Sequence, residues 1–461
     1  MAAQHSETVD LLVIGWGKAG KTLAGTAARA GRRVALVEQS ADMVGGSCIN
    51  IACVPTKILI HDAQGRTAED DPEDWFAAAV ARRDSLTAAM RKKNFELLDD
   101  LDSVLLVSGR ARFTGEREVL VTDGPDTLTL TADAVVINTG SVPAVPPIPG
   151  ARIGGRIHSS ETLQHVDPLP RSLIVVGGGY VGLEFASMFA HFGAEVTVLD
   201  RGERPLADED PDVAETVAEA LRGDGAAITS GATVTEVRDG ADSAEVVYEV
   251  AGVEQRAAAD AVLLALGRSP ATAGLGLDVA GVDTDDSGYV IVDERLRTSA
   301  AGVYAAGDVN GGPQFTYVSL DDSRILTDQL LGEGARSTAD RRALQYTMFL
   351  TPPLSRAGLT EAQAREQGYD VRVGVKPVAD VAAAPRAKIE GDPRGIIKVV
   401  VDGATDQVLG AALMHVHSQE VINLVALAMR HGITASQLRD EIYTHPSATE
   451  ALNEVLGTLH S

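Results

Sequence analysis

The sequence has 461 residues, 45% of them hydrophobic, and a net charge of −25, a composition typical of a globular protein with more than one domain. The excess of acidic over basic residues leaves no cationic surface for nucleic acid or acidic membranes, so we expect neither partner. No apolar run reaches the roughly 18 residues of a membrane span, and no basic segment followed by an apolar one opens the chain. Two cysteines are too few for a disulfide-stapled secreted fold, which favours a cytoplasmic protein.

The chain opens with a predicted strand, turn, helix and strand at residues 10–14, 15–20, 22–30 and 34–38. The turn contains Gly15, Gly17 and Gly20 as GxGxxG, and Glu38 ends the second strand. In dinucleotide-binding domains these glycines permit a tight turn, close approach of a pyrophosphate and packing of helix on strand. The helix N-terminus attracts the phosphates, and the acid binds a ribose. This unit therefore predicts a dinucleotide site.

The same pattern recurs about 160 residues later, with a predicted strand, turn, helix and strand at residues 173–176, 177–182, 183–192 and 196–200. Gly177, Gly179 and Gly182 form the second GxGxxG, and Asp200 occupies the position of the acid. An acid there repels a 2′-phosphate and favours NADH. Arg201 and Arg204 follow directly, so NADPH remains possible.

The rest of the chain separates these units and then changes in character. A helix is predicted at residues 77–98, short strands over 104–130, and strands at 135–137, 261–266 and 303–306. From about Tyr346 no glycine-rich loop occurs, and helices at 360–367, 419–431 and 435–440 alternate with strands at 371–375 and 396–401. The prediction is an α/β fold with two Rossmann-like dinucleotide-binding domains and a C-terminal α+β domain.

Both cysteines lie in one segment. Cys48 and Cys53 are separated by four residues and lie about one helical turn apart if the segment is helical. Zinc would need two further ligands, and His61 is the one nearby candidate. A structural disulfide closing so short a loop adds little stability. We interpret the pair as a reversible dithiol, which a helix N-terminus can activate.

A reversible dithiol also needs a group that holds a proton for the leaving thiol. His445 is a candidate, with Glu450 to orient it. Spacing alone does not single it out from the other histidines, which are more often surface or packed residues.

These motifs, together with Ala306-Gly307-Asp308 and the run from His445 to Glu450, resemble the pyridine-nucleotide–disulfide oxidoreductases of the glutathione reductase and lipoamide dehydrogenase type. They occur in family order over essentially the whole chain. The resemblance implies FAD on the first glycine loop, NAD(P)H on the second, and a homodimer. The resemblance also implies three domains: an FAD-binding domain (1–148 and 272–343), an NAD(P)H-binding domain (149–271) and a dimerisation domain (344–461).

The resemblance also implies residue roles. Cys53 faces the flavin and Cys48 meets the substrate, while Tyr180 stands where the family has a gate residue. Lys57 and Glu184 pair beside the flavin, and His445 and Glu450 face the cysteines of the other subunit. The implied FAD-binding residues are Gly15, Gly17, Gly20, Glu38, Thr139, Gly140 and Asp308. The implied NAD(P)H-binding residues are Gly177, Gly179, Tyr180, Gly182, Asp200 and Gly267. No metal site is predicted.

Within the family, four segments are similar to the branch of bacterial reactive-chlorine-resistance flavoproteins: residues 15–24, 61–64, 314–322 and 351–356. That branch is associated with NADH-dependent reduction of copper(II) and of hypothiocyanous acid. The resemblance implies an enzyme that reduces a small-molecule or metal-ion oxidant in defence against reactive chlorine species.

Several alternatives stay open. Dihydrolipoamide dehydrogenase shares the dithiol and the His–Glu pair. Mercuric reductase is disfavoured because residues 456–461 lack its additional cysteine pair, and glutathione reductase because Asp200 disfavours NADPH. A non-catalytic flavin-binding protein would be expected to lack a cysteine or the His–Glu pair. A metal-trafficking protein could use His415 and His417, although such a pair is more often simple packing.

Overall fold

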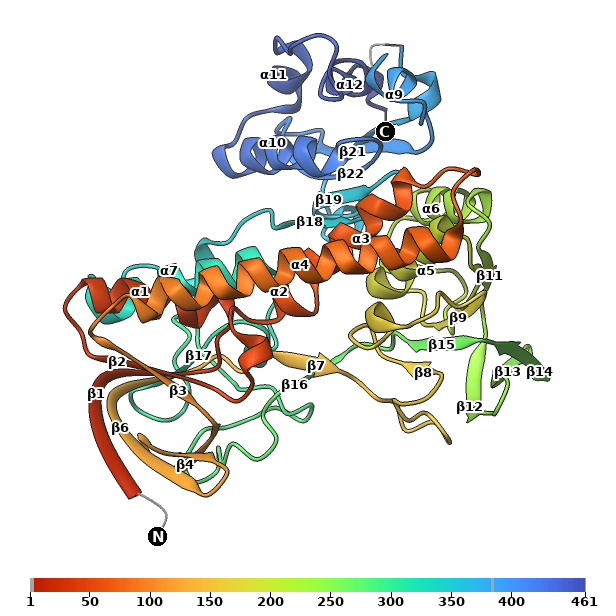
Figure 1. Cartoon of the computed structure of the whole chain (residues 1–461). Coiled ribbons are helices and arrows are strands. Elements are labelled where there is room, and N and C mark those ends of the chain that lie inside the picture. The colour runs from red at the N-terminus through yellow and green to blue at the C-terminus, as the bar shows by residue number, and fades with distance from the viewer. Residues whose placement is uncertain (1–3, 383–384, 461) are drawn as a thin grey trace. The chain divides into compact units, whose positions relative to one another are not determined.

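The computed structural model describes residues 4–382 and 385–460, and the chain divides into two compact units (Figure 1). Unit 1 contains the residues up to Leu59 together with Ala79–Ala144 and Gly267–Asp340. Unit 2 contains Ile60–Ala78, Val145–Leu266 and the residues from Arg341 onward. Two helices, α3 (Cys53–Gly65) and α4 (Pro72–Asp99), have residues in both units.

Unit 1 is built on a seven-stranded sheet in the order β3-β2-β1-β6-β5-β4, with β17 also paired to β6. Its strands are β1 (Gln4–Ile14), β2 (Val34–Glu38), β3 (Val104–Ser108), β4 (Arg110–Gly115), β5 (Glu118–Asp123), β6 (Asp126–Ile137) and β17 (Val303–Ala305). A two-stranded sheet pairs β7 (Ser141–Pro143) with β16 (Arg268–Pro270). The helices that lie wholly in unit 1 are α1 (Lys18–Arg29), α2 (Ser47–Asn50) and α7 (Thr316–Leu331).

Strands β3, β2, β1, β6 and β17 run parallel to one another, whereas β5 is antiparallel to β6. Alternate residues of β1 face two different hydrophobic clusters, with Leu12 in one and Val13 in the other. Parallel strands buried on both faces read as continuous apolar runs, which explains why residues 10–14 show no polar alternation. Since parallel strands end at the same sheet edge, the turns that follow Ile14, Ile137 and Ala305 lie close together, and this edge carries the first glycine loop.

Unit 2 contains a five-stranded parallel sheet in the order β11-β10-β9-β15-β8, which carries the second glycine loop. Its strands are β8 (Ile157–His158), β9 (Ser172–Val176), β10 (Glu195–Leu199), β11 (Ala227–Thr229) and β15 (Ala261–Leu264). A three-stranded antiparallel sheet packs beside it, made of β12 (Thr233–Asp239), β13 (Ala244–Val250) and β14 (Val253–Ala259). The helices of this part are α5 (Tyr180–Phe192) and α6 (Pro211–Gly223).

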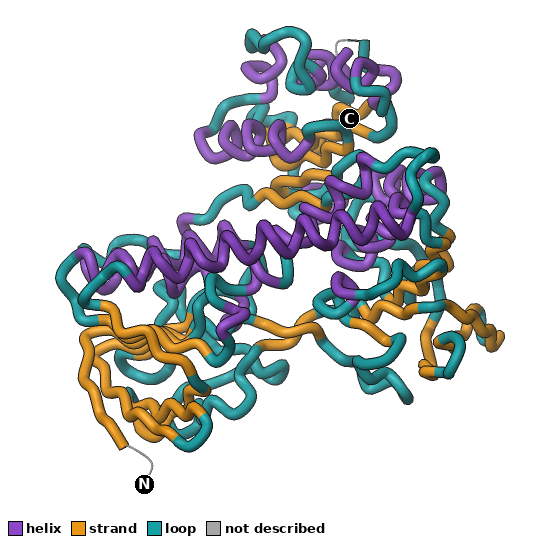
Figure 2. Tube along the Cα trace, in the orientation of Figure 1, coloured by secondary structure: helices purple, strands orange, loops and turns teal. Residues whose placement is uncertain are grey.

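The last part of unit 2 is a five-stranded antiparallel sheet in the order β18-β19-β22-β21-β20. Figure 2 shows its strands in orange, with helices in purple. Its strands are β18 (Gln345–Met348), β19 (Leu354–Gly358), β20 (Val371–Pro377), β21 (Ile396–Asp402) and β22 (Val408–Met414). Helices α8 (Glu361–Glu366), α9 (Pro385–Ile389), α10 (Ser418–His431), α11 (Ala435–Asp440) and α12 (Ala451–Val455) accompany it. Residues of β21, β22, α10 and α12 share one hydrophobic cluster, so this sheet has a core of its own.

Most predicted elements are observed, with shifted ends. The predicted helix at 77–98 is part of the longer α4, and the predicted strand at 261–266 ends at Leu264. Three strands of the C-terminal sheet, β18, β19 and β22, were not predicted. Strand β22 is buried on both faces, so its apolar run lacks the alternation that identifies a half-buried strand. No helix in residues 4–382 and 385–460 is long and apolar enough to cross a membrane.

Candidate active site

The first glycine loop leaves β1 at Ile14 and enters α1 through Gly17. Gly15 has a φ of 99°, a conformation that glycine adopts without the Cβ penalty. At the end of β2, the Glu38 carboxylate accepts hydrogen bonds from the backbone N–H groups of Trp16 and Ser40, both at 3.1 Å. Burial raises the pKa of Glu38, while these bonds act in the opposite direction. Glu38 therefore closes the loop and has further acceptor sites for a ribose.

Asn138, the residue after β6, joins this loop to the Ala306-Gly307-Asp308 turn. Its Oδ1 accepts from Gly20 N at 2.8 Å, and its Nδ2 donates to Ala306 O at 2.6 Å. A Cβ atom at Gly17 or Gly20 would lie only 2.5 or 2.7 Å from Asn138 Oδ1. The glycines at these two positions thus also make room for Asn138. Our sequence reasoning did not predict this role, because it depends on three segments that are far apart along the chain.

Polar groups around these turns fit a bound FAD. Within the described residues, the buried Thr139 Oγ1 and Trp16 Nε1 atoms have no hydrogen-bond partner, and buried polar groups are normally paired. In the first turn of α1, Ala19 N and Gly20 N donate to Ser319 Oγ and Asn138 Oδ1, so a phosphate would meet the positive end of the helix at Gly17 and Lys18. The Asp308 carboxylate accepts from Ser141 Oγ at 2.8 Å. Gly140 lies between Thr139 and Ser141 with a φ of 74°.

The second glycine loop has the same form in unit 2. Gly177 has a φ of 112° after β9, and a Cβ at Gly182 would lie 2.0 Å from Gly177 O. Gly179 is the N-terminal residue before α5. Asp200 follows β10, and a Cβ at Gly178 would lie 2.8 Å from its carboxyl carbon. The acid is therefore beside the loop, where the sequence predicts a ribose.

Two further residues that bear on the nicotinamide prediction, Arg204 and Gly267, have contacts within their own units. Arg204 donates to the carbonyls of Ala207 and Glu209, both at 3.1 Å. Its guanidinium is thus bound to its own loop. Gly267 lies between β15 and β16 with a φ of 106°, and its carbonyl accepts from Ala144 N at 3.0 Å.

The two cysteines lie on different helices rather than on one continuous turn. Cys48 belongs to the four-residue α2, and Cys53 is the first residue of α3. Pro55 has no N–H and would break a helix running through the whole segment, but it is tolerated in the first turn of a new one. The chain is in the dithiol form. A hydrogen bond with Cys53, and after it burial, raise the pKa of the Cys48 thiol. The two thiols therefore lose their protons in separate steps, and the second proton of the pair is held more tightly than the first.

The turn before Cys48 is held by three side chains. Lys21 Nζ donates to Gly45 O at 2.8 Å and to Asn94 Oδ1 at 2.6 Å. Asn50 Nδ2 donates to the carbonyls of Val44 and Gly46, both at 2.9 Å, and Arg91 Nε donates to Asn50 Oδ1. Burial lowers the pKa of Lys21 to about 8, and the Lys21 charge in turn favours the Cys48 thiolate. Neither Lys21 nor Arg91 was predicted as a site residue.

Cys53 is exposed and lies at the start of a second helix. Its Sγ is 3.5 Å from Thr316 Oγ1, and Thr316 is the first residue of α7. A Cβ at Gly46 would lie 2.9 Å from the Cα of Gly17, so the cysteine turn packs directly on the first glycine loop. The structure thereby places the dithiol beside the predicted FAD loop within unit 1.

Three predicted residues lie on α3 and α5. Tyr180 begins α5 and Glu184 follows one turn later, so the two share a helix face. Glu184 Oε1 accepts from Phe349 N at 2.7 Å. Lys57 belongs to unit 1 and Glu184 to unit 2, and their pairing stays a prediction.

His445 and Glu450 are in contact. Glu450 Oε1 lies 2.8 Å from His445 Nδ1, and Oε2 accepts from Ser447 N at 2.8 Å. Partial burial raises the pKa of Glu450, but the bonds from Ser447 and His445 outweigh it, so the pKa lies below its ordinary value. An ionised Glu450 requires hydrogen at Nδ1, which leaves Nε2 as the proton acceptor. The imidazole is 70% exposed.

His415 and His417 have other partners. His415 is buried, with Nδ1 2.7 Å from Val416 O, and burial lowers its pKa to about 4. His417 Nε2 lies 2.8 Å from Glu390 Oε1. Across the described residues, no three His, Cys, Asp or Glu side chains form a group that could hold a metal ion.

Comparison with known proteins agrees with this geometry. The pyridine nucleotide-disulphide oxidoreductase model matches residues 9–323, and the dimerisation domain of the same family matches residues 344–456. The chain belongs to the pyridine nucleotide-disulfide oxidoreductases, flavoenzymes that use FAD and NAD(P)H. The predicted family, fold class and enzyme class are confirmed.

Individual relatives narrow the comparison. The Escherichia coli (strain K12) protein named "Probable pyridine nucleotide-disulfide oxidoreductase RclA" is 46% identical over 446 residues, which cover 97% of this chain and 98% of RclA. A mercuric reductase of Staphylococcus aureus is 35% identical, with 96% of this chain and 81% of the relative covered. A dihydrolipoyl dehydrogenase of Thermus scotoductus is 34% identical, with 98% of both covered.

Solved structures give the same result. A Cu(II) complex of the HOCl-induced flavoprotein disulfide reductase RclA from Escherichia coli matches with a TM-score of 0.93 and 44% identity, covering 98% of this chain and 99% of that one. The chain is therefore a flavoprotein disulfide oxidoreductase similar to RclA.

Proposed function

We propose that this enzyme uses NADH to reduce an oxidant such as copper(II) or hypothiocyanous acid, and that it defends the cell against reactive chlorine species. The observation that carries this proposal is the similarity to RclA over nearly the full length of the chain. RclA is described as an HOCl-induced protein, and one of its solved structures is a Cu(II) complex. The dithiol beside the first glycine loop supports a route in which electrons leave the enzyme for the oxidant from a cysteine sulfur atom. A cytoplasmic location fits a dithiol that must be kept reduced.

The cofactor assignments follow from the two loops. FAD supplies two-electron redox chemistry between a nicotinamide and a disulfide when it is bound. Gly15, Gly17 and Gly20 would hold its pyrophosphate, Glu38 a ribose and Asp308 the ribityl chain. Thr139 and Gly140 would also contact the FAD. Gly177, Gly179, Gly182, Asp200 and Gly267 would hold the nicotinamide dinucleotide. The buried Thr139 hydroxyl, which has no hydrogen-bond partner in the described part of the chain, supports this assignment.

NADH is the preferred donor in this proposal. Asp200 repels a 2′-phosphate, and Arg204, one of two arginines that could offset this effect, is bound to the carbonyls of its own loop. Arg201 remains as the other cation near the site.

The cysteines carry the chemistry to the oxidant. With hypothiocyanous acid, the Cys48 thiolate attacks the sulfur atom of the oxidant and releases hydroxide, which forms a sulfenyl thiocyanate, Cys48 Sγ–SCN. Cys53 then attacks the Cys48 sulfur, releases thiocyanate and restores the disulfide. Two electrons pass from the dithiol to the oxidant. With copper(II), two ions each take one electron and the dithiol loses two protons.

His445 is proposed to hold the proton that Cys48 gives up, with Glu450 fixing the imidazole. The resemblance places the pair opposite the cysteines of the other subunit, so the proposal includes a homodimer. We also propose that residues 1–148 and 272–343, 149–271 and 344–461 are the FAD-binding, NAD(P)H-binding and dimerisation domains. Light scattering should give twice the mass of one chain, and an active monomer would remove His445 from this role.

The test is NADH oxidation by the FAD-loaded enzyme with hypothiocyanous acid, copper(II), mercury(II), lipoamide and oxidised glutathione. Hypothiocyanous acid or copper(II) should give the highest kcat/KM. Higher activity with lipoamide would instead support the dihydrolipoamide dehydrogenase alternative. Cys48→Ser and Cys53→Ser are a matched pair, and each should abolish hypothiocyanous acid reduction. Wild-type turnover by Cys48→Ser would contradict the thiol route for that oxidant.

A further inference from the structure

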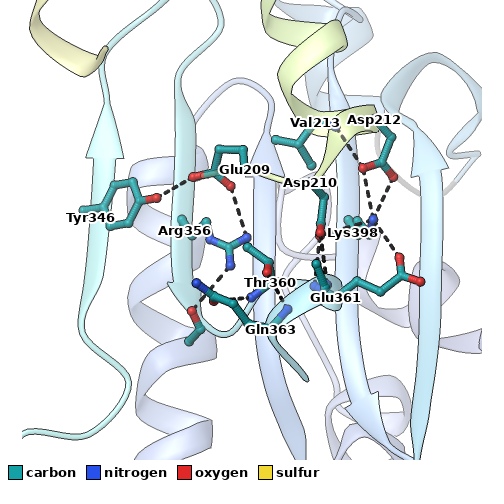
Figure 3. A network of polar contacts seen from close by, with 12 residues as sticks. Glu209, Asp210, Asp212, Val213, Tyr346, Arg356, Thr360, Glu361, Gln363 and Lys398 are labelled. Carbon is teal, nitrogen blue, oxygen red and sulfur yellow. Dashed lines mark hydrogen bonds and ion pairs between the residues drawn. The ribbon is translucent and has the colours of Figure 1, made fainter. Parts of the chain in front are cut away.

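The hydroxyl of Tyr180 is the first member of a chain of polar contacts in unit 2. Tyr180 OH donates to Tyr346 OH at 2.8 Å, and Tyr346 OH donates to Glu209 Oε1 at 2.5 Å. Glu209 Oε2 lies 3.2 Å from the guanidinium of Arg356. In Figure 3, Tyr346, on β18, and Arg356, on β19, each contact one carboxylate oxygen of Glu209. We call Tyr180, Tyr346 and Glu209 the tyrosine latch.

The inner end of the latch is charged and buried. The side chains of Glu209 and Arg356 are 1% and 5% exposed. Burial, and then the negative charge of Glu209, raise the pKa of Tyr346, so its phenol stays protonated and donates to the carboxylate. The lone pairs of the Tyr346 oxygen are thereby oriented to accept from Tyr180. Hydrogen bonds to an ionised group are about twice as strong as neutral ones. The bond between the hydroxyls of Tyr180 and Tyr346 is therefore the weakest contact in this series, which runs from Tyr180 to Arg356.

The residues beside Glu209 are fixed as well. Asp210 accepts from the backbone N–H groups of Glu361 and Ala362 at 3.0 and 3.3 Å. Lys398 Nζ lies 3.3 Å from Asp210 and 2.9 Å from Asp212 (Figure 3). These contacts bind the Glu209 segment to α8 and β21 of the C-terminal sheet. The Tyr180 side of the latch differs, because Tyr180 is 38% exposed.

A second contact joins the same strand region to α5. Phe349 N, just after β18, donates to Glu184 Oε1 at 2.7 Å. Tyr180 and Glu184 therefore both contact the segment from Tyr346 to Phe349. These are the two α5 residues that the family resemblance places near the nicotinamide and the flavin.

We propose that Tyr346, fixed by Glu209 and Arg356, is a positioning residue that holds Tyr180 in its closed position, so that NADH binding must break the bond between the two hydroxyls. The inference deepens the proposed function and rests on one part of it, the role of Tyr180 as the gate to the nicotinamide site. The segment of the C-terminal sheet thus controls access of NADH without touching it.

The expected effect follows from a two-state gate. If the closed form predominates, the apparent dissociation constant of NADH equals the intrinsic constant divided by the open fraction. A net contribution typical of one hydrogen bond corresponds to about a 2- to 12-fold change in an equilibrium constant. Removing the hydroxyl contact should lower the apparent dissociation constant by that factor. The two rings lie 5.1 Å apart, and phenylalanine keeps this contact, so Tyr→Phe removes the hydroxyl alone.

The experiment is anaerobic stopped-flow reduction of the FAD-loaded enzyme by NADH, without any oxidant. The variants are Tyr180→Phe, Tyr346→Phe and the double variant. Each should lower the apparent dissociation constant of NADH about 2- to 12-fold. In Tyr346→Phe, whose residue lies outside the proposed NADH site, the limiting rate of flavin reduction should stay within about twofold of wild type. The double variant should show no more than the effect of one single variant, because both remove the same contact.

A matched control is Tyr369→Phe. Tyr369 is exposed and makes no side-chain hydrogen bond within the part of the chain that the structure describes, so its loss should leave the constant unchanged. Tyr346→Phe also removes the hydroxyl that donates to the buried carboxylate of Glu209. If Tyr346→Phe does not fold for this reason, Tyr180→Phe still tests the latch, because it leaves the bond between Tyr346 and Glu209 intact.

An unchanged or raised dissociation constant in Tyr180→Phe would overturn the proposal, as would single effects that multiply in the double variant. Since no oxidant is present, these results do not depend on which oxidant the enzyme reduces. If wild-type flavin were not reduced by NADH at all, the proposed donor would fail instead of the latch.

Discussion

Substitution of Asn138 by alanine tests whether one buried amide fixes the first glycine loop. Asn138 is 4% exposed, and its two bonds, 2.8 Å from Gly20 N and 2.6 Å to Ala306 O, connect α1 to the end of β17. Asn138→Ala removes both partners and leaves a buried N–H and a buried carbonyl. Each such group costs about 1–3 kcal/mol, so we expect a loss of about 2–6 kcal/mol. Water entering the space left by the amide would move the value toward the lower end.

The measurement is the temperature at which the FAD-loaded enzyme releases its flavin, followed by flavin fluorescence. For a unit of this size about 1 kcal/mol shifts a transition by roughly 2–4 °C, so the transition should fall by about 4–24 °C. The purified variant should also hold less FAD, because the freed loop no longer presents its N–H groups in one geometry.

Asn423→Ala is the matched control. Asn423 also makes two hydrogen bonds, at 3.1 Å from Gln345 and 2.8 Å to Gln419 O, but it is exposed on α10. Water can replace both bonds, and its transition should stay within about 2 °C of wild type. If Asn138→Ala behaved like this control and kept a full complement of FAD, the reasoning about the buried amide would be refuted.

Three further predictions concern the site. Asp200→Ala should raise KM for NADH and reduce the preference of the enzyme for NADH over NADPH by about tenfold or more, because hydrogen bonds to a charged group contribute about 1.5–3 kcal/mol. A stronger preference for NADH in steady-state assays of the variant would contradict this role of Asp200. Lys21→Met should slow alkylation of Cys48 in the reduced enzyme, measured by peptide mass spectrometry. Since burial depresses the pKa of Lys21 to about 8, its charge is lost above that pH, and the difference from wild type should close by about pH 9–10; a difference that persists there would contradict it. Glu450→Gln should slow the oxidative half-reaction about tenfold or more, part of what acid–base catalysis by His445 supplies. The pKa of Glu450 lies below its ordinary value of 4.5. The contribution of the ionised carboxylate to the stability of the folded protein is therefore complete above pH 4.5 and is lost only as the pH falls through the lower pKa of the folded state. The wild-type rate should accordingly show no titration of Glu450 between about pH 5 and 9.

The sequence by itself determined the features that depend on neighbouring residues. Both GxGxxG turns, with an acid at the end of the next strand, could be predicted because turn, helix start and strand follow one another along the chain. The redox interpretation of Cys48 and Cys53 needed no more than their spacing and the absence of further zinc ligands. The break between their helices could also have been predicted from Pro55, which cannot continue a helix that started at Ser47.

Only the tertiary structure decided which distant residues complete the site. Asn138 contacts Gly20 and Ala306 because parallel strands end at one sheet edge, and no local pattern reports that convergence. The same holds for Lys21 at the cysteine turn and for Tyr346 at Tyr180, which is 166 residues away along the chain. Strands β19 and β22 went unpredicted because burial on both faces removes the alternation that marks a strand. Strand β18 has four residues, three of them half-buried, and is too short to show an alternation. Local chemistry is thus encoded in short motifs, whereas the polar contacts that position it arise from packing between segments and are visible only once the chain is folded.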